Sequence, residues 1–60
     1  MYYLSMVYPN HEEIIFESED LDLVEYEYRD AIDDTDYNHK NDIEYYEIWS
    51  DNGSIMTTFV

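Results

Sequence analysis

Cysteine is absent from this sixty-residue sequence, and glycine and proline occur once each. Without cysteine the chain forms no disulfide and no thiolate metal site, and a lone glycine provides no phosphate-cradling glycine loop. No apolar run approaches the roughly 20 residues of a transmembrane helix. The first residues carry no basic charge, so we expect neither a signal peptide nor a membrane span. We expect the protein to be cytoplasmic.

Basic residues are the next shortage. Two bases face sixteen acids, and the formal net charge at pH 7 is -14. A chain without a basic patch is not expected to bind a phosphate backbone directly, and an anionic membrane surface repels it. High net charge is typical of disorder. Aromatic residues nevertheless make up 18% of the sequence, and apolar residues recur with clear periods, so we expect one folded acidic domain over residues 1–60.

The first part of the chain predicts a β-hairpin. Residues 2–8 are dominated by β-forming residues whose side chains would alternate between two faces, and residues 12–17 give a second short strand. The turn residues Pro9 and Asn10 lie between them. In the second strand, strict alternation puts Ile14 and Phe16 on the same face.

A single helix is predicted over residues 19–33. Ser18 is a good N-cap, and acids in the first turn suit the positive end of the helix dipole. Apolar residues then return at helical spacing along one face, namely Leu21, Val24, Tyr28, Ala31 and Ile32. The polar residues 34–41 are expected to form a loop. Their acids match the first ligand positions of a calcium-binding EF-hand but not the later ones, so no metal site is expected.

The end of the chain predicts a second hairpin. Residues 42–49 are rich in Ile, Tyr and Trp, and residues 55–60 return as a final strand. Between them lie Asn52 and Gly53, a strong hairpin signal because both positions accept a positive φ. We therefore predict an α+β fold of order ββαββ, in which a small antiparallel sheet carries one helix.

No arrangement of side chains points to catalysis. The serines lack a nucleophile elbow, and the two histidines, His11 and His39, fall in separate predicted loops. A domain of this size also leaves little room for a substrate pocket. We expect no enzyme activity and no cofactor.

Acids form a stripe opposite the apolar face of the predicted helix. Seven acids and Arg29 lie within residues 19–33, which gives one net charge per roughly 3.7 Å of helix axis, against about 3.4 Å per phosphate on a DNA strand. Arg29 lies four residues from Glu25 and from Asp33, so we expect it to pair with both. Tyr26 is an aromatic of the kind favoured at interfaces. The predicted partner-binding residues are Glu19, Asp22, Glu25, Tyr26, Glu27, Asp30, Asp33 and Asp34.

In charge, size and aromatic content the whole chain resembles the DNA-mimic proteins, which are small acidic inhibitors often made by phages and other mobile elements. The resemblance implies a protein that evades host defence in the host cytoplasm. It would fill the positive groove of a DNA- or RNA-binding protein, such as a restriction enzyme, a CRISPR effector, uracil-DNA glycosylase or a nucleoid protein.

Two alternatives stay open on the sequence. The first is a small acidic regulatory module that binds a basic partner protein without imitating DNA. The second, a structural protein adapted to high salt, explains the charge but not the many tyrosines. The weakly charged end of the chain, Thr58 to Val60, is also a candidate edge for pairing in a homodimer.

Overall fold

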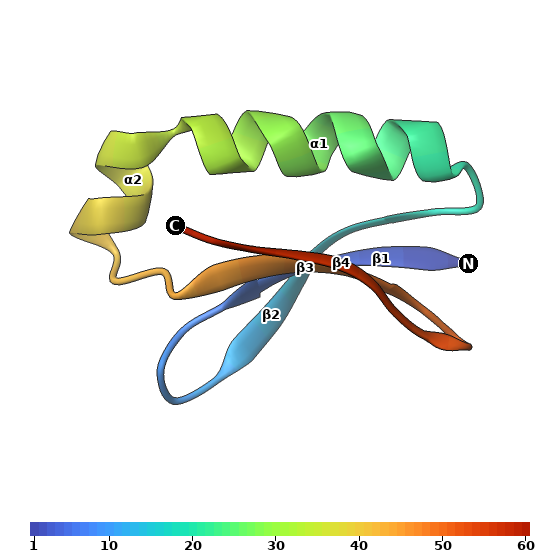
Figure 1. Ribbon diagram of the computed structural model, residues 1–60, viewed down its shortest axis with the longest axis horizontal. Helices are drawn as coiled ribbons and strands as arrows, with labels where there is room; N and C mark the ends of the chain where they lie inside the picture. The colour runs from blue at the N-terminus through green and yellow to red at the C-terminus, as the bar shows by residue number, and fades with distance from the viewer.

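The computed structural model describes residues 1–60 and contains one four-stranded antiparallel sheet and two helices (Figure 1). The strands lie in the order β2-β1-β3-β4, so β1 and β3 are central and β2 and β4 form the edges. The predicted α+β class and the ββαββ order are confirmed, and a second, short helix is added. The elements are β1 (Tyr2–Val7), β2 (Glu12–Ser18), α1 (Leu21–Asp33), α2 (Thr35–Lys40), β3 (Tyr45–Ser50) and β4 (Gly53–Phe59).

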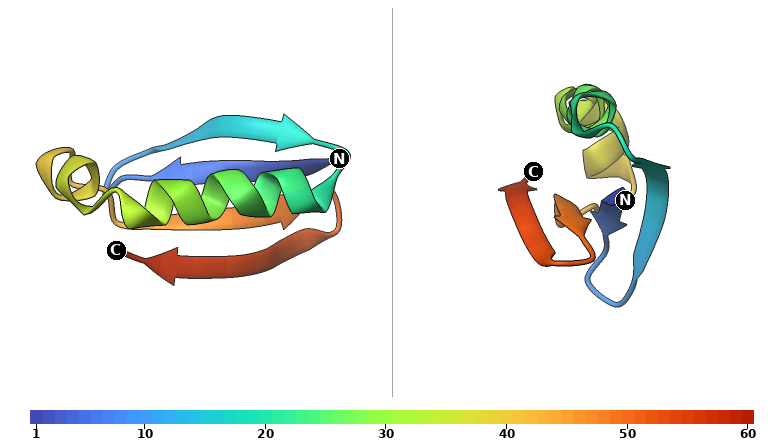
Figure 2. Two further views of the ribbon diagram at one scale, coloured as in Figure 1. Left: turned by 90° about the horizontal axis from the view of Figure 1, so that it is seen from above. Right: turned by 90° about the vertical axis from the view of Figure 1, so that its right-hand side faces the viewer.

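Helix α1 lies lengthwise over the two central strands (Figure 2, left). The register puts Leu4 opposite Ile48 and Met6 opposite Tyr46, and all four side chains are buried under the helix. The predicted apolar face of α1 meets them, with Val24 completely buried. Seen end-on, the edge strands curve toward the helix on either side of the central pair (Figure 2, right). The core is therefore a single layer of side chains between α1 and the concave face of the sheet.

A β-bulge interrupts the alternation of β2. Leu4 pairs with Phe16, but the next residue, Ser5, pairs with Ile14, so Ile15 is the extra residue of β2. Phe16 packs against the core. Ile14 pairs instead with Ser5, on the face of the sheet away from the helix, and is 52% exposed. The prediction that Ile14 and Phe16 share a face is therefore wrong, because a bulge shifts the alternation by one residue.

Helix α1 begins later than predicted. Its N-cap is Asp20, whose carboxylate accepts a hydrogen bond from the Asp22 N–H at 3.0 Å. The Ser18 hydroxyl instead accepts from the Asp20 N–H at 3.0 Å. Ser18 still belongs to β2, so Glu19 lies in the connection before the helix and not in its first turn.

The segment predicted as a polar loop contains helix α2. Asp34 caps it, because its Oδ1 accepts a hydrogen bond from the Tyr37 N–H at 3.2 Å. At its other end Asp42 takes a positive φ of 56° and donates its N–H to the His39 carbonyl, while the Ile43 N–H bonds to the Asn38 carbonyl. This pair of bonds is a Schellman C-cap. Capping at both ends thus makes a helix of a polar segment, and the third strand starts at Tyr45 instead of residue 42.

The second hairpin forms at the predicted place. Ser50 pairs with Gly53, so Asp51 and Asn52 are the central turn residues. Within this turn Gly53 has a positive φ, 123°, and Asn52 does not. Of the two residues expected to accept a positive φ, only the glycine takes one. The Asn52 N–H instead donates to the Ser50 hydroxyl at 3.1 Å, a side-chain bond that stabilises the turn.

Candidate interaction surface

The surface of the molecule carries every one of its carboxylates. Of the sixteen acids none is buried, and only Glu25, Glu27 and Glu47 are even half-buried. The longest dimension of the fold is 30 Å, so the net charge of -14 amounts to one charge per about 2.1 Å. Duplex DNA carries one per about 1.7 Å of axis. The charge density of a duplex is thus approached by the molecule as a whole.

The predicted contact residues lie mostly where the helical pattern puts them. Asp22, Tyr26, Asp30 and Asp33 are exposed on the outer side of α1, and Tyr26 is 71% exposed. Glu25 and Glu27 flank this stripe and are half-buried. Glu19 and Asp34 are exposed just outside the two ends of the helix.

The linear charge density along α1 itself is lower than predicted. Because the helix starts at Leu21, it contains five acids and Arg29, a net charge of -4. Its 13 residues span about 20 Å, or one net charge per about 5 Å. The predicted density of one charge per 3.7 Å is therefore wrong for this helix, and acids before it and on the strands supply the rest.

Arg29 does not form the predicted ion pairs. The one ion pair of the structure joins His11 Nε2 to Glu13 Oε1 at 3.5 Å, at the start of β2 and not on α1. Arg29 is exposed, and an exposed pair of this kind contributes only about 0.2–1 kcal/mol against the entropy of ordering two long side chains. The carboxylates of α1 therefore have no cationic partner within the protein.

Most of the tyrosines and the tryptophan have a structural role in the fold. Tyr3 stacks on Trp49 with ring centroids 4.4 Å apart, on the sheet face that no helix covers. The Trp49 Nε1–H donates to the Ser5 hydroxyl at 2.6 Å, which satisfies a completely buried serine. On the helix face, the Tyr28 hydroxyl bonds to that of Thr58. The aromatic rings thus cover a thin sheet from both sides, and the exposed Tyr26 is an exception.

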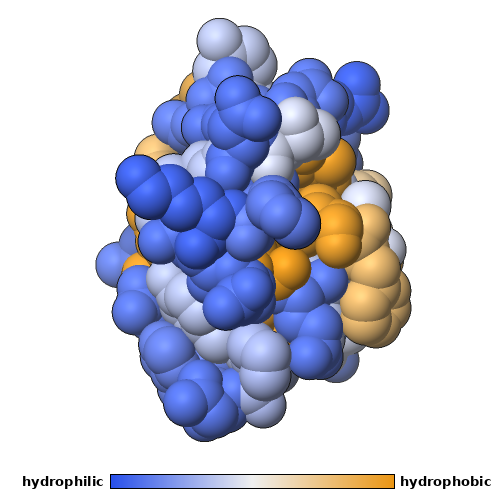
Figure 3. All heavy atoms as spheres, turned by 90° about the vertical axis from the view of Figure 1, so that its left-hand side faces the viewer, coloured by the Kyte–Doolittle hydropathy of each residue, from blue (hydrophilic) through white to orange (hydrophobic).

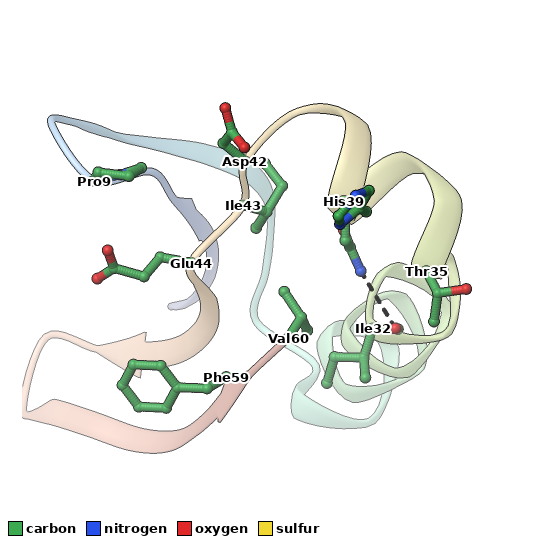
Figure 4. Close-up of a pocket in the computed structure, with 10 residues that line it drawn as sticks. Pro9, Ile32, Thr35, His39, Asp42, Ile43, Glu44, Phe59 and Val60 are labelled. Atoms are coloured by element: carbon green, nitrogen blue, oxygen red, sulfur yellow. Dashed lines mark hydrogen bonds between the residues drawn. The ribbon is translucent and has the colours of Figure 1, made fainter.

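A groove opens at the end of the molecule that carries α2. Its volume is about 810 Å³. Its apolar side chains show between hydrophilic neighbours in the space-filling view of this end (Figure 3). Figure 4 shows the segments that meet there: the junction of the two helices, the connection before β3, the Pro9 turn and the end of β4. The lining includes Ile32, Thr35, Asp42, Ile43, Glu44, Phe59 and Val60. Sequence reasoning missed this groove because its residues come from distant segments with no common pattern.

Asn38 holds the wall of this groove in place. It is almost completely buried, and its Nδ2 donates to the carbonyls of Ala31 at 3.0 Å and Ile32 at 3.3 Å, the latter drawn as the dashed line in Figure 4. The Tyr46 hydroxyl donates to Asn38 Oδ1 at 2.6 Å. Burial raises the pKa of the Tyr46 phenol. Asn38 thus ties α2 to the end of α1 and to β3, and its oxygen is occupied within the fold.

Comparison with protein-family models, with curated proteins and with solved structures returns no match. Neither helix has the length and apolar character needed to cross a membrane.

Proposed function

We propose that this protein is a DNA mimic that binds and inhibits a nucleic-acid-binding protein by occupying its positive groove. One observation carries the proposal. A net charge of -14 is distributed over a fold 30 Å long, every carboxylate is at the surface, and no lysine or arginine neutralises any of them. We place its action in the cytoplasm, which is the host's where a mobile element encodes the chain.

The inhibition would follow from simple electrostatics. A protein that binds DNA lines its groove with lysine and arginine, and it gains free energy when counterions leave the DNA phosphates. Carboxylates held on a folded scaffold offer the same groove a similar charge density without a base sequence. Opposite charge also accelerates the encounter. Tyr26, exposed in the middle of the α1 stripe, would add an aromatic contact at the centre of the interface.

A competition assay tests this function. Fluorescent duplex DNA is bound to each of several unrelated proteins, such as a restriction enzyme, uracil-DNA glycosylase and a nucleoid protein, and this protein is titrated in. We expect displacement of DNA from at least one of them, and the displacement should weaken as salt is added. Absence of competition at every target at low salt would refute DNA mimicry for that panel, and competition insensitive to salt would refute its electrostatic basis.

Two matched triple variants locate the contact. Reversal of Asp22, Asp30 and Asp33 to Lys changes the net charge from -14 to -8 on α1. Reversal of the three β2 acids Glu12, Glu13 and Glu17 makes the same change on the edge strand. We expect the α1 variant to lose at least about tenfold more affinity, roughly 1.4 kcal/mol. Equal losses would mean that total charge alone decides binding, and a larger loss for β2 would move the contact off the helix.

The groove beside α2 supports a second candidate function, that of an acidic module that binds a basic partner without imitating DNA. An apolar floor with Asp42 and Glu44 at its rim suits a peptide with one apolar anchor between basic residues. Thr35→Trp, at an exposed position of the lining, would fill this groove while leaving the α1 stripe intact. A partner that is lost with this variant, but retained by the α1 triple variant and undisturbed by DNA, would favour the second function.

A further inference from the structure

Strand β4 is an edge strand without charge. Residues 52–60 contain no acidic or basic side chain in a protein where nearly a third of all residues are charged. Strand β1 is equally uncharged, but it is central and paired on both sides. The other edge, β2, carries Glu12, Glu13 and Glu17, and charges of this kind block pairing between sheets. One edge of the sheet is thus protected and the other is open.

The open edge presents unpaired backbone groups. The Val60 N–H donates to the Glu44 carbonyl at 3.2 Å, so this residue points its backbone groups toward the β3 side. In an antiparallel ladder the direction alternates, which turns the backbone groups of Thr57 and Phe59 away from β3. The side chains around them are apolar and accessible, with Phe59 70% exposed and Ile55 40% exposed.

We propose that a second copy of this chain pairs with β4, antiparallel, around a two-fold axis at Thr57. This axis sets Thr57 opposite itself and brings Phe59 near the second copy's Ile55, the residue at which the pairing of β4 with β3 shifts its register. Two sheets then join into one of eight strands. The interface is isologous, because the same patch serves both subunits.

The distribution of charge favours a second copy of this chain, and not a basic protein, as the partner of β4. A basic partner would be met best by an acidic edge, and β2 offers one whereas β4 does not. A second acidic copy can approach closely only where charges are missing. The two-fold axis, perpendicular to the sheet, leaves both α1 helices on the same face with their acids directed outward. This inference goes beyond the proposed function and does not depend on it.

The dependence on salt concentration distinguishes dimerisation through β4 from binding to a basic target. Two chains of charge -14 repel each other, and screening weakens that repulsion. Sedimentation velocity at about 0.05 M and about 0.5 M NaCl should therefore show the dimer fraction rising with salt, while binding to a basic target falls. Dimerisation without DNA competition would overturn only the proposed function, and competition by a strict monomer would overturn only the dimer. A wild-type chain that stays monomeric at high salt and high protein concentration overturns the inference.

Two variants locate the interface. Thr57→Pro removes an outward N–H without touching the bonds to β3, so we expect a monomer at both salt concentrations with an unchanged circular dichroism spectrum. A folded Thr57→Pro variant that still dimerises overturns the proposed edge. Because the chain has no cysteine, Thr57→Cys is a single reporter: hydrogen-bonded partners lie about 5.5 Å apart, within disulfide range.

Oxidation should cross-link the Thr57→Cys chain at least about tenfold faster than Ile14→Cys, which is also at an exposed site but on the opposite edge of the sheet. Equal rates for the two variants overturn the register at Thr57. This comparison also tests the pairing of β4 with a second copy if the Thr57→Pro variant fails to fold.

Discussion

The hydrogen bond between Tyr46 and Asn38 allows a quantitative test of how so small a core is held together. The variants are Tyr46→Phe, Asn38→Ala and their combination. Tyr46→Phe removes only the hydroxyl and leaves the buried Asn38 Oδ1 without its 2.6 Å bond, which should cost about 1–2 kcal/mol. Asn38→Ala removes that bond and those to the Ala31 and Ile32 carbonyls, and it also leaves a cavity, so about 3 kcal/mol or more is expected.

These costs are large for a chain of sixty residues. At about 0.05–0.15 kcal/mol per residue, the whole domain is stable by roughly 3–9 kcal/mol. We therefore expect Tyr46→Phe to remain folded and Asn38→Ala to be close to unfolding at low salt. The two variants share one bond, so the double variant should be less destabilised than the sum of both by about 1 kcal/mol.

Urea unfolding followed by Trp49 fluorescence measures these differences, with salt present to raise the stability of all variants. With a slope of about 1 kcal/mol per M, Tyr46→Phe should lower the midpoint by about 1–2 M. Tyr37→Phe is the matched control, because Tyr37 is 44% exposed and should change the free energy of unfolding by less than about 0.5 kcal/mol. Equal effects of the two Tyr→Phe changes, or strict additivity in the cycle, would refute the role given to this bond.

Three further predictions concern backbone, charge and pH. Asp42→Gly should raise the free energy of unfolding by about 1 kcal/mol in urea, because glycine accepts the positive φ of 56°; Asp36→Gly, which removes the same charge within α2, should lower it by about 1 kcal/mol. The urea midpoint of the wild type should rise with NaCl, and a salt-independent midpoint would contradict a major role for self-repulsion. Burial is the main cause that raises the pKa values of Tyr3, Tyr8 and Tyr46 above 10.0. The folded state therefore holds these protons more tightly than the unfolded chain does. The contribution of these tyrosines to the free energy of unfolding should be fully present below pH about 10 and should be lost as the pH rises beyond it, as circular dichroism against pH would show.

Local pattern was sufficient for most of the secondary structure. Runs of β-forming residues between turn signals marked the strands, and helical spacing placed Val24 and Tyr28 on the buried side of α1 and Tyr26 on the exposed side. These features follow from the period of the backbone, which is the same whatever the rest of the chain does. The stripe of acids on α1 was predictable for the same reason.

Helix α2 and the β2 bulge escaped prediction because neither has a period. Six polar residues become a helix through the cap at Asp34, the Schellman end at Asp42 and the buried bonds of Asn38. The Asn38 bonds join it to the end of α1 and to the third strand, so no window of sequence contains them. The groove beside α2 depends on the same contacts.

By itself, the sequence determined the charge of -14, the order of strands and main helix, and which face of that helix is acidic, since each of these belongs to the chain or to its local geometry. Only the tertiary structure decided that β1 and β3 are central, and hence that an acidic strand protects one edge while the uncharged β4 leaves the other open. Strand pairing joins residues far apart in the chain and is selected by how the core closes under α1. The same folding leaves none of the carboxylates buried in a molecule 30 Å long, so that the charge per unit length of the whole molecule approaches that of duplex DNA.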